Sequence, residues 1–276
     1  MRGLIRLSDY SEQEIFEIFK IADLLQAGEY TDLLQGKTIV LFFPASSLRT
    51  RITFEKGIQM LGGQSILFSP ETLDKRESLQ DVAGYLNNWV DAVIIRHKSI
   101  EVLDTFRKYA DFPVINAMTD INHPCEVLSD LYALSKRRKD FLKDEYLFLG
   151  VKGNIGLAWK EAADVLHLSF TQCCPKGYEI PGIPAQHELR MAIEGKDIVC
   201  TDSLPAERRP DFKEYQITEE IMAFANADAL LNPCPPFFRE EEVSANAISS
   251  QYFVGYKFKK HLLEIQQAIL IFSLMH

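Results

Sequence analysis

The sequence has few cysteines, and their arrangement argues against a protein stabilised by disulfides or by a structural metal ion. Five cysteines occur in 276 residues, an odd number with scattered spacing, so we do not expect a disulfide framework. No pair of cysteines, and no cysteine and histidine together, has the spacing of a zinc site. The simplest prediction is therefore a reduced, cytoplasmic protein without a bound metal.

Long hydrophobic runs and a positive net charge are also missing. No run approaches the about 20 apolar residues that span a bilayer, and no apolar stretch typical of a secretory signal follows Met1. The formal net charge is −9, which argues against nucleic acid or a membrane surface as a partner. Hydrophobic residues make up 47% and charged residues 25%, an ordinary globular composition that argues against disorder.

What the sequence does contain is a regular alternation of short apolar runs and amphipathic segments. Residues 38–43 read as a buried parallel strand, and residues 12–26 as a helix that begins with a capping box of Ser11 and Glu14. We expect further strands at 64–68, 92–96, 113–116, 146–149, 168–172, 197–201 and 229–231. We expect further helices at 50–61, 79–88, 100–109, 123–139, 157–166, 185–194, 218–224 and 259–274.

This alternation predicts an α/β fold with two doubly wound parallel-sheet domains. We place the boundary near the basic run 136–139, which we expect to end a helix in solvent, where cations suit the helix dipole. The first domain then covers residues 1–135, with the C-terminal helix 257–276 packing back on it. The second domain covers residues 136–256.

The segment from Ser46 to Arg51 lies between the first apolar strand and the following helix, and it suits an anion. Ligands of open α/β sheets bind at the carboxyl ends of strands, and a helix N-terminus offers unpaired N–H groups. Hydroxyl groups and the guanidinium of Arg49, which can hold a phosphate with two hydrogen bonds, add to this. A serine N-cap beside two surface arginines is the alternative interpretation.

The same segment resembles the carbamoyl phosphate loop of the aspartate/ornithine carbamoyltransferases. The usual form of that loop is Ser-Thr-Arg-Thr-Arg, and Leu48 here replaces the first threonine. The resemblance extends over nearly the whole chain. It implies that the phosphate of carbamoyl phosphate is bound by Ser47, the backbone of Leu48, Arg49 and Thr50.

Further positions resemble donor-binding residues of that family. Arg96 matches an arginine at a strand end that contacts phosphate and the carbamoyl oxygen, and His123 opens the stretch His-Pro-Cys-Glu, similar to the family's His-Pro-x-Gln. Glu126 replaces the glutamine, and it can still accept a hydrogen bond from the carbamoyl NH2. Its charge near a dianionic phosphate would weaken binding, raise its own pKa or alter the chemistry. Lys75 matches a lysine of the family's mobile loop, which reaches a neighbouring subunit's active site; an exposed charged loop is the alternative.

The second half of the chain resembles the family's acceptor site less completely. The glycine spacing of 150–156 is a weak dinucleotide fingerprint, but no acidic residue ends the next strand to hold a ribose. The resemblance implies acceptor binding by Asn154, Asp202, Ser203, Asn232, Cys234 and Pro235. Neither the ornithine nor the aspartate signature is complete, and a family arginine in the final helix has no clear match. Its possible substitutes are Lys257, Lys259, Lys260 and His261.

The resemblance implies a carbamoyltransferase that moves the carbamoyl group of carbamoyl phosphate to an amino-acid amine, ornithine or a related one. Arg49, Arg96 and His123 would stabilise the developing charge and the leaving phosphate. The family uses no metal or organic cofactor and forms homotrimers. Its active site lies in the cleft between a donor domain, here 1–135, and an acceptor domain, here 136–256. Aspartate as acceptor, and a non-catalytic or weakened ligand-binding member, are the alternatives.

Overall fold

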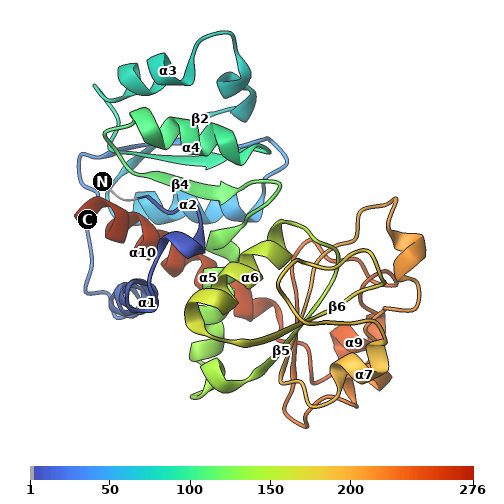
Figure 1. Cartoon of the computed structure of the whole chain (residues 1–276). Coiled ribbons are helices and arrows are strands. Elements are labelled where there is room, and N and C mark those ends of the chain that lie inside the picture. The colour runs from blue at the N-terminus through green and yellow to red at the C-terminus, as the bar shows by residue number, and fades with distance from the viewer. Residues whose placement is uncertain (1–2) are drawn as a thin grey trace. The chain divides into compact units, whose positions relative to one another are not determined.

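The computed structural model describes residues 3–276 and divides into two compact units (Figure 1). Unit 1 comprises the chain up to Leu134 together with Lys259–His276, and unit 2 comprises Ser135–Phe258. Residues 1 and 2, with which the predicted first domain begins, lie outside the described range. Within that range, every helix is too short or too polar to cross a membrane.

Unit 1 is built on a parallel sheet of four strands in the order β2-β1-β3-β4. The strands are β1 (Thr38–Phe42), β2 (Gln64–Phe68), β3 (Ala92–Arg96) and β4 (Val114–Met118). The chain runs outward from β1 to β2 and then returns to the other side of β1 for β3. The strand order therefore reverses between β1 and β3, and open α/β sheets bind ligands beside such a switch point.

Helices cover the sheet of unit 1. They are α1 (Glu12–Gln26), α2 (Arg49–Met60), α3 (Leu79–Leu86), α4 (Ile100–Tyr109), α5 (Pro124–Ser135) and α10 (Leu262–Met275). One face of the sheet packs on α3 and α4, where Val40 and Ile95 share a buried cluster with Phe106. The C-terminal helix α10 packs against α1 and α2 (Figure 1). Gly57 permits this close approach, because an added Cβ would lie 2.9 Å from Cγ of Gln267.

Unit 2 has a separate parallel sheet of five strands in the order β7-β6-β5-β8-β9. The strands are β5 (Glu145–Leu149), β6 (Ser169–Cys173), β7 (Ala185–Gln186), β8 (Ile198–Thr201) and β9 (Leu230–Pro233). The order reverses between β5 and β8, so unit 2 has a switch point of its own. The two parallel sheets and their helices are the α/β architecture that the alternating pattern predicts.

The strand β5 shows why this sheet is buried on both faces. Leu147 and Leu149 point into a cluster that includes residues of three short helices, α7 (Leu189–Ile193), α8 (Glu219–Met222) and α9 (Ala245–Ser249). Tyr146 directly precedes Leu147 and packs on Trp159 of α6 (Asn154–Leu166), with ring centroids 5.8 Å apart. Short 3₁₀ helices complete the chain: η1 (Leu7–Asp9), η2 (Pro70–Asp74), η3 (Phe141–Lys143), η4 (Arg209–Phe212) and η5 (Tyr256–His261).

The prediction for the basic run 136–139 was wrong in one respect. The helix α5 ends at Ser135, so the run follows the helix instead of forming its last turn. Arg137 donates to the carbonyl of Val254 over 2.8 Å, and Arg138 contacts Asp144 at 2.5 Å. Both arginines contact loops of unit 2, whereas the exposure of Lys136, Arg137 and Lys139 to solvent agrees with the prediction.

Three smaller differences concern helices. Residues 185–194 do not form one helix, because Ala185–Gln186 pairs with β6 as a short edge strand and α7 begins only at Leu189. The last α-helix begins at Leu262, since residues 259–261 belong to η5. The helix α9 was not predicted; it has only 5 residues, too few to show a helical period.

Candidate functional site

The first turn of α2 is open to a ligand. Its N-cap residue is Leu48, whose apolar side chain is 63% exposed, and no side chain of residues 3–276 caps the turn. The first N–H groups of α2 therefore remain available at the positive end of the helix dipole. The alternative interpretation, a serine N-cap, was wrong: Ser47 precedes the cap residue and is buried.

The loops after β1 and β3 bring Ser47 and Arg96 together at the switch point of unit 1. Nη1 of Arg96 donates a hydrogen bond to Oγ of Ser47 over 3.1 Å. The register between β3 and β4 shifts between Ile95 and Arg96, and such irregularities commonly re-aim a side chain beside a functional site. The next residue, His97, is buried and contacts Asp74 of η2 at 3.0 Å, which anchors the strand end.

Positive charge is concentrated at this switch point. Burial, and then the charge of Arg49, lowers the pKa of Arg96, whereas the charge of Glu126 opposes the shift. An arginine nevertheless remains protonated in a protein. Two guanidinium groups that repel one another therefore lie beside an uncapped helix N-terminus. A bound anion would stabilise this arrangement.

His123 lies directly before α5 and is neutral at neutral pH. Burial lowers the pKa of His123 to about 4; the charge of Glu126 opposes the shift, while Arg96 and Lys259 add to it. Its Nδ1 is buried and has no hydrogen-bond partner among residues 3–276. A neutral imidazole can donate one hydrogen bond and accept another without bringing charge to the site.

Glu126 is buried, but its charge is compensated within unit 1. Nζ of Lys259 lies 2.9 Å from Oε1 of Glu126 and 2.5 Å from Oδ1 of Asp130. Burial is the largest single effect and by itself would raise the pKa of Glu126, but the charge of Lys259, the charges of His123 and Arg49 and the hydrogen bond from Lys259 together outweigh it, and the pKa falls below its ordinary value. A raised pKa, one of the three consequences considered for a glutamate beside phosphate, is thus not what the protein without a ligand shows. Among the basic residues considered as substitutes near the last helix, Lys259 is the one that reaches this glutamate.

The remaining donor-site candidates occupy different surroundings. Thr50 is buried in the first turn of α2, next to the exposed Arg49. Lys75 follows η2 in an exposed segment, and no hydrogen bond or ion pair among residues 3–276 joins it to Arg49 or Arg96. The structure of a single chain therefore brings together Ser47, Arg96 and the residues around α5, and it leaves Lys75 apart.

In unit 2 the candidate acceptor residues lie after β5, after β8 and within or directly after β9. Asn154 is the first residue of α6, and Asp202 directly follows β8. A Cβ added at Gly153 would lie 4.0 Å from Oδ2 of Asp202, so the loops after β5 and β8 lie side by side at the switch point. Oδ1 of Asp202 accepts a hydrogen bond from the N–H of Ser203 over 2.9 Å, which orients the carboxylate.

The candidates after β9 are packed more deeply. Asn232 is 1% exposed, and its Nδ2 lies 4.0 Å from Sγ of Cys200. The N–H of Cys234 donates to the carbonyl of Thr201 over 3.0 Å, and Pro235 is joined to the next residue by a cis peptide bond. Asn232 and Cys234 are thus buried beside the sheet, whereas Asp202 and Ser203 are only half-buried.

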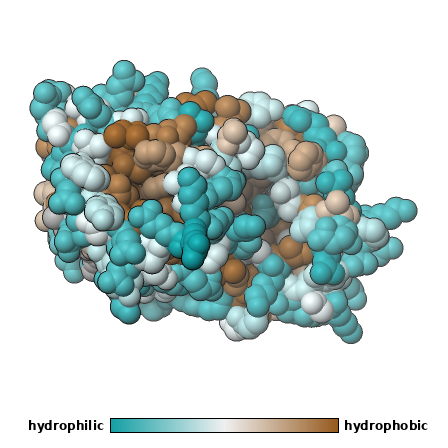
Figure 2. Space-filling model, turned by 90° about the horizontal axis from the view of Figure 1, so that it is seen from above, coloured by the Kyte–Doolittle hydropathy of each residue, from teal (hydrophilic) through white to brown (hydrophobic). Residues whose placement is uncertain are grey.

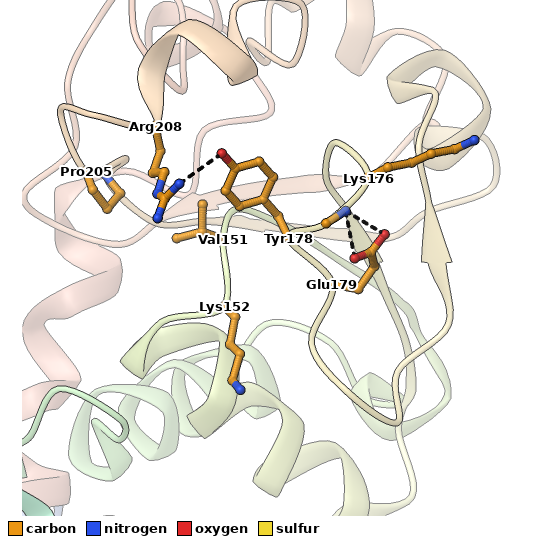
Figure 3. A pocket seen from close by; sticks show the side chains of 8 residues that line it. Val151, Lys152, Lys176, Tyr178, Glu179, Pro205 and Arg208 are labelled. Atoms are coloured by element: carbon orange, nitrogen blue, oxygen red, sulfur yellow. Dashed lines mark hydrogen bonds between the residues drawn. The ribbon is translucent and has the colours of Figure 1, made fainter.

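A pocket of about 470 Å³ is lined by residues of the loops after β5, β6 and β8 (Figure 3). Its lining residues are Val151, Lys152, Lys176, Gly177, Tyr178, Glu179, Pro205 and Arg208. Arg208 donates to Oη of Tyr178 over 3.4 Å, while Lys152 and Lys176 point in different directions (Figure 3). None of the predicted acceptor residues lines this pocket, and its cations do not converge on one point.

The chain is similar to known carbamoyltransferases over nearly its whole length. The family described as aspartate/ornithine carbamoyltransferase, carbamoyl-P binding domain, matches residues 2–136, and the corresponding Asp/Orn binding domain matches residues 144–273. An ornithine carbamoyltransferase of Methylococcus capsulatus is 32% identical over 293 residues, which cover 99% of this chain and 98% of that protein.

Solved structures agree with these sequence matches. The ornithine carbamoyltransferase from Pyrococcus furiosus has a TM-score of 0.93 at 26% identity, over 99% of this chain and 97% of that one. The ornithine carbamoyltransferase from Burkholderia thailandensis has a TM-score of 0.92 at 28% identity, over 100% and 99%.

Proposed function

Because the chain belongs to the aspartate/ornithine carbamoyltransferase family, we propose that it transfers the carbamoyl group of carbamoyl phosphate to the amine of ornithine or a closely related amino acid. The observation that carries the proposal is the contact between Arg96 and Ser47 beside the uncapped first turn of α2. Hydroxyl, guanidinium and backbone N–H donors gather there at a switch point, where a phosphate is bound most readily.

The proposed reaction is a direct transfer. The neutral amine of the acceptor attacks the carbonyl carbon of carbamoyl phosphate, and a new N–C bond forms. The bond between that carbon and the oxygen that bridges it to phosphorus breaks. Inorganic phosphate then leaves, and the amine loses a proton. Arg49 and Arg96 stabilise the negative charge on the phosphate, and neutral His123 donates a hydrogen bond to the carbamoyl oxygen. Ser47, the backbone of Leu48 and Thr50 hold the phosphate, and holding both reactants in place supplies much of the remaining acceleration.

For the acceptor we propose the residues that follow β5, β8 and β9. Asp202 holds the α-amino group, because its carboxylate is half-buried, oriented by Ser203 and beside the loop that precedes Asn154. We propose that the buried residues Asn232 and Cys234, with Pro235, line the base of the acceptor site. The relatives named ornithine carbamoyltransferase support ornithine over aspartate as the acceptor.

An acceptor panel tests the proposal. The purified protein is incubated with carbamoyl phosphate and L-ornithine, L-aspartate or related amines, and the ureido product is measured by colour. We expect product with L-ornithine or a close relative of it. Product with L-aspartate alone would assign the chain to the aspartate type, and no product with any amine, despite bound carbamoyl phosphate, would indicate a ligand-binding protein without activity.

We also propose a homotrimer in which Lys75 reaches the donor site of a neighbouring copy. All five residues of the edge strand β2 are exposed, including Ile66 and Phe68, and Ile52 and Met60 of α2 are exposed as well. Figure 2 looks down on the end of unit 1 that carries α3 and β2, and it shows hydrophobic side chains gathered there. An unpaired apolar edge of this kind is normally covered by another chain.

Light scattering tests the trimer. The expected mass is three times 31.5 kDa, and Phe68→Lys is expected to yield a monomer because it places a charge in the apolar edge. A monomeric native protein would contradict the trimer and leave Lys75 without its proposed role.

We further propose a cytoplasmic protein whose ligands are small molecules. All five cysteines are free, which suits a reducing compartment. The net charge of −9 favours neither nucleic acid nor an anionic membrane as a partner.

A further inference from the structure

A lysine from the C-terminal segment contacts two buried carboxylates beside the proposed donor site of unit 1. Lys259 contacts Glu126 and Asp130, which are spaced i and i+4 and therefore lie on one face of α5. Glu126 is 6% exposed and Asp130 is 2% exposed, so both carboxylates are nearly removed from water. A buried carboxylate without a partner is costly, and Lys259 supplies that partner across 133 positions of sequence.

The contact also decides what Glu126 can offer to a ligand. Lys259 donates to Oε1 of Glu126, which leaves the second carboxylate oxygen, Oε2, to accept from another group. An ionised carboxylate accepts hydrogen bonds through both oxygens and donates none. A glutamine at this position would behave differently beside Lys259: its single oxygen would face the lysine, and its NH2 group would be the part left for the ligand.

Other charged groups act on Glu126 from every side of the cluster. They are Arg49 from α2, Arg96 from β3, His123 directly before α5, and Lys259 from η5, which also contacts Asp130 of α5. The charge of Lys259 is the largest of the effects that lower the pKa of Glu126, so the carboxylate stays ionised at neutral pH although it is buried. The two guanidinium groups are those proposed to bind the phosphate, and Glu126 belongs to the same electrostatic cluster.

We propose that Lys259 is a positioning residue of the donor site: by occupying Oε1 it turns Glu126 into an acceptor for the NH2 group of carbamoyl phosphate. The pair Glu126 and Lys259 thus does together what a glutamine does alone in the family motif. The proposal rests on the proposed function, because it takes carbamoyl phosphate as the donor. It predicts selectivity as well: a phosphate ester whose acyl group carries a methyl in place of NH2, such as acetyl phosphate, cannot donate to Oε2 and binds less tightly.

A double-mutant cycle tests this pairing in the full-length protein. The variants are Glu126→Gln, Lys259→Met and the double variant, and affinity for carbamoyl phosphate is measured by calorimetry at pH 8. We expect each single change to weaken binding about tenfold, or about 1.4 kcal/mol. We expect the double variant to bind within about threefold of the native protein, because neighbouring residues that act as a pair do not have additive effects.

Three further measurements separate positioning from a structural role. Inorganic phosphate, which has no NH2 group, should bind Glu126→Gln at least as tightly as it binds the native protein, because the variant only removes a negative charge. In Lys259→Met the pKa of Glu126 rises, because the charge of Lys259 no longer lowers it. The loss of carbamoyl phosphate affinity should therefore shrink as pH falls and the carboxyl group takes up a proton. Lys259→Arg should retain binding, and Lys260→Met, a change at the exposed neighbouring lysine, is the matched control.

The outcomes are distinct. The role of Lys259 would be overturned if the double variant lost affinity for carbamoyl phosphate by the product of the two single fold-losses. It would also be overturned if Glu126→Gln kept native affinity and native selectivity against acetyl phosphate. The Glu126→Gln result stands even if Lys259→Met does not fold, because that variant keeps the contact between Lys259 and Asp130. Carbamoyl phosphate binding without turnover of any amine would overturn the proposed function and leave the pairing intact.

Discussion

The two units present their candidate residues in contrasting ways. In unit 1 the candidates are Ser47 after β1, Arg96 at the end of β3, and His123 and Glu126 at the start of α5, which follows β4. A hydrogen bond or electrostatic effects join them within one chain. In unit 2, Asp202 and Ser203 stand beside the loop after β5, while Asn232 and Cys234 are packed into the end of the sheet. The candidate donor residues of unit 1 are close together and charged, and the candidate acceptor residues of unit 2 are dispersed.

The physical demands of the two ligands explain this contrast. A phosphate requires several donors and positive charges at one point, so its site needs a helix N-terminus and closely spaced arginines. An amino-acid side chain is recognised by a few contacts on longer loops, which tolerate sequence change. The resemblance of the chain to its family is accordingly stronger around Arg49 than around Asp202.

The largest effect is expected from Arg49→Ala. Loss of this guanidinium should weaken carbamoyl phosphate binding at least about 100-fold, because truncating one partner of a charge-assisted pair costs roughly 2–5 kcal/mol. Calorimetry measures the affinity, and Arg107→Ala is the control, since Arg107 pairs with Asp9 on the surface of the same unit. Unchanged affinity in Arg49→Ala would remove the donor site from this loop.

A second effect concerns the stability of the buried cluster. The pKa of His123 falls from 6.5 to about 4 on folding, so between these values the unfolded chain binds more protons and stability rises with pH. From pH 5 to pH 7 the free energy of unfolding should gain about 2 kcal/mol from this residue. Urea unfolding of His123→Gln should lack that gain, whereas His276→Gln should keep it; identical pH dependence in His123→Gln would show that His123 is not buried in its neutral form.

The smallest effect is expected in unit 2. Asp202→Asn should raise KM for the acceptor about tenfold, since it removes one charge-assisted contact, and it should leave carbamoyl phosphate binding unchanged. Asp211→Asn, a change in η4 that removes a contact with Tyr178, is the control. A loss of carbamoyl phosphate affinity in Asp202→Asn would mean that the two sites are not separable in the way the comparison suggests.

Much of the fold follows from local patterns, and the failures have identifiable causes. The helix α1 occupies Glu12–Gln26 as its period predicts, and its capping box between Ser11 and Glu14 is present. The strand β7 was missed because two residues carry no period, and it forms only by pairing with β6. The run 136–139 was misread because its partners, including Val254 and Asp144, are supplied by unit 2 after folding.

For the candidate donor residues as well, some features could be read from the sequence and others could not. Ser47, Arg96 and His123 were predicted from the resemblance to the family, and each lies at or after the end of a strand, where strand ends of one parallel sheet meet at one edge. The effect of Glu126 was misjudged, because its compensating lysine is 133 positions away and reaches α5 only when the C-terminal segment returns to unit 1.

By itself, the sequence determined the α/β class, the strand ends that carry the donor residues and the family to which the chain belongs. These depend on hydrophobic period, on caps and on residues adjacent in sequence. Only the tertiary structure decided which helix turn is uncapped, where the basic run binds and how Glu126 stays ionised. Those outcomes depend on burial and on charges brought together from distant parts of the chain, and no local pattern encodes them.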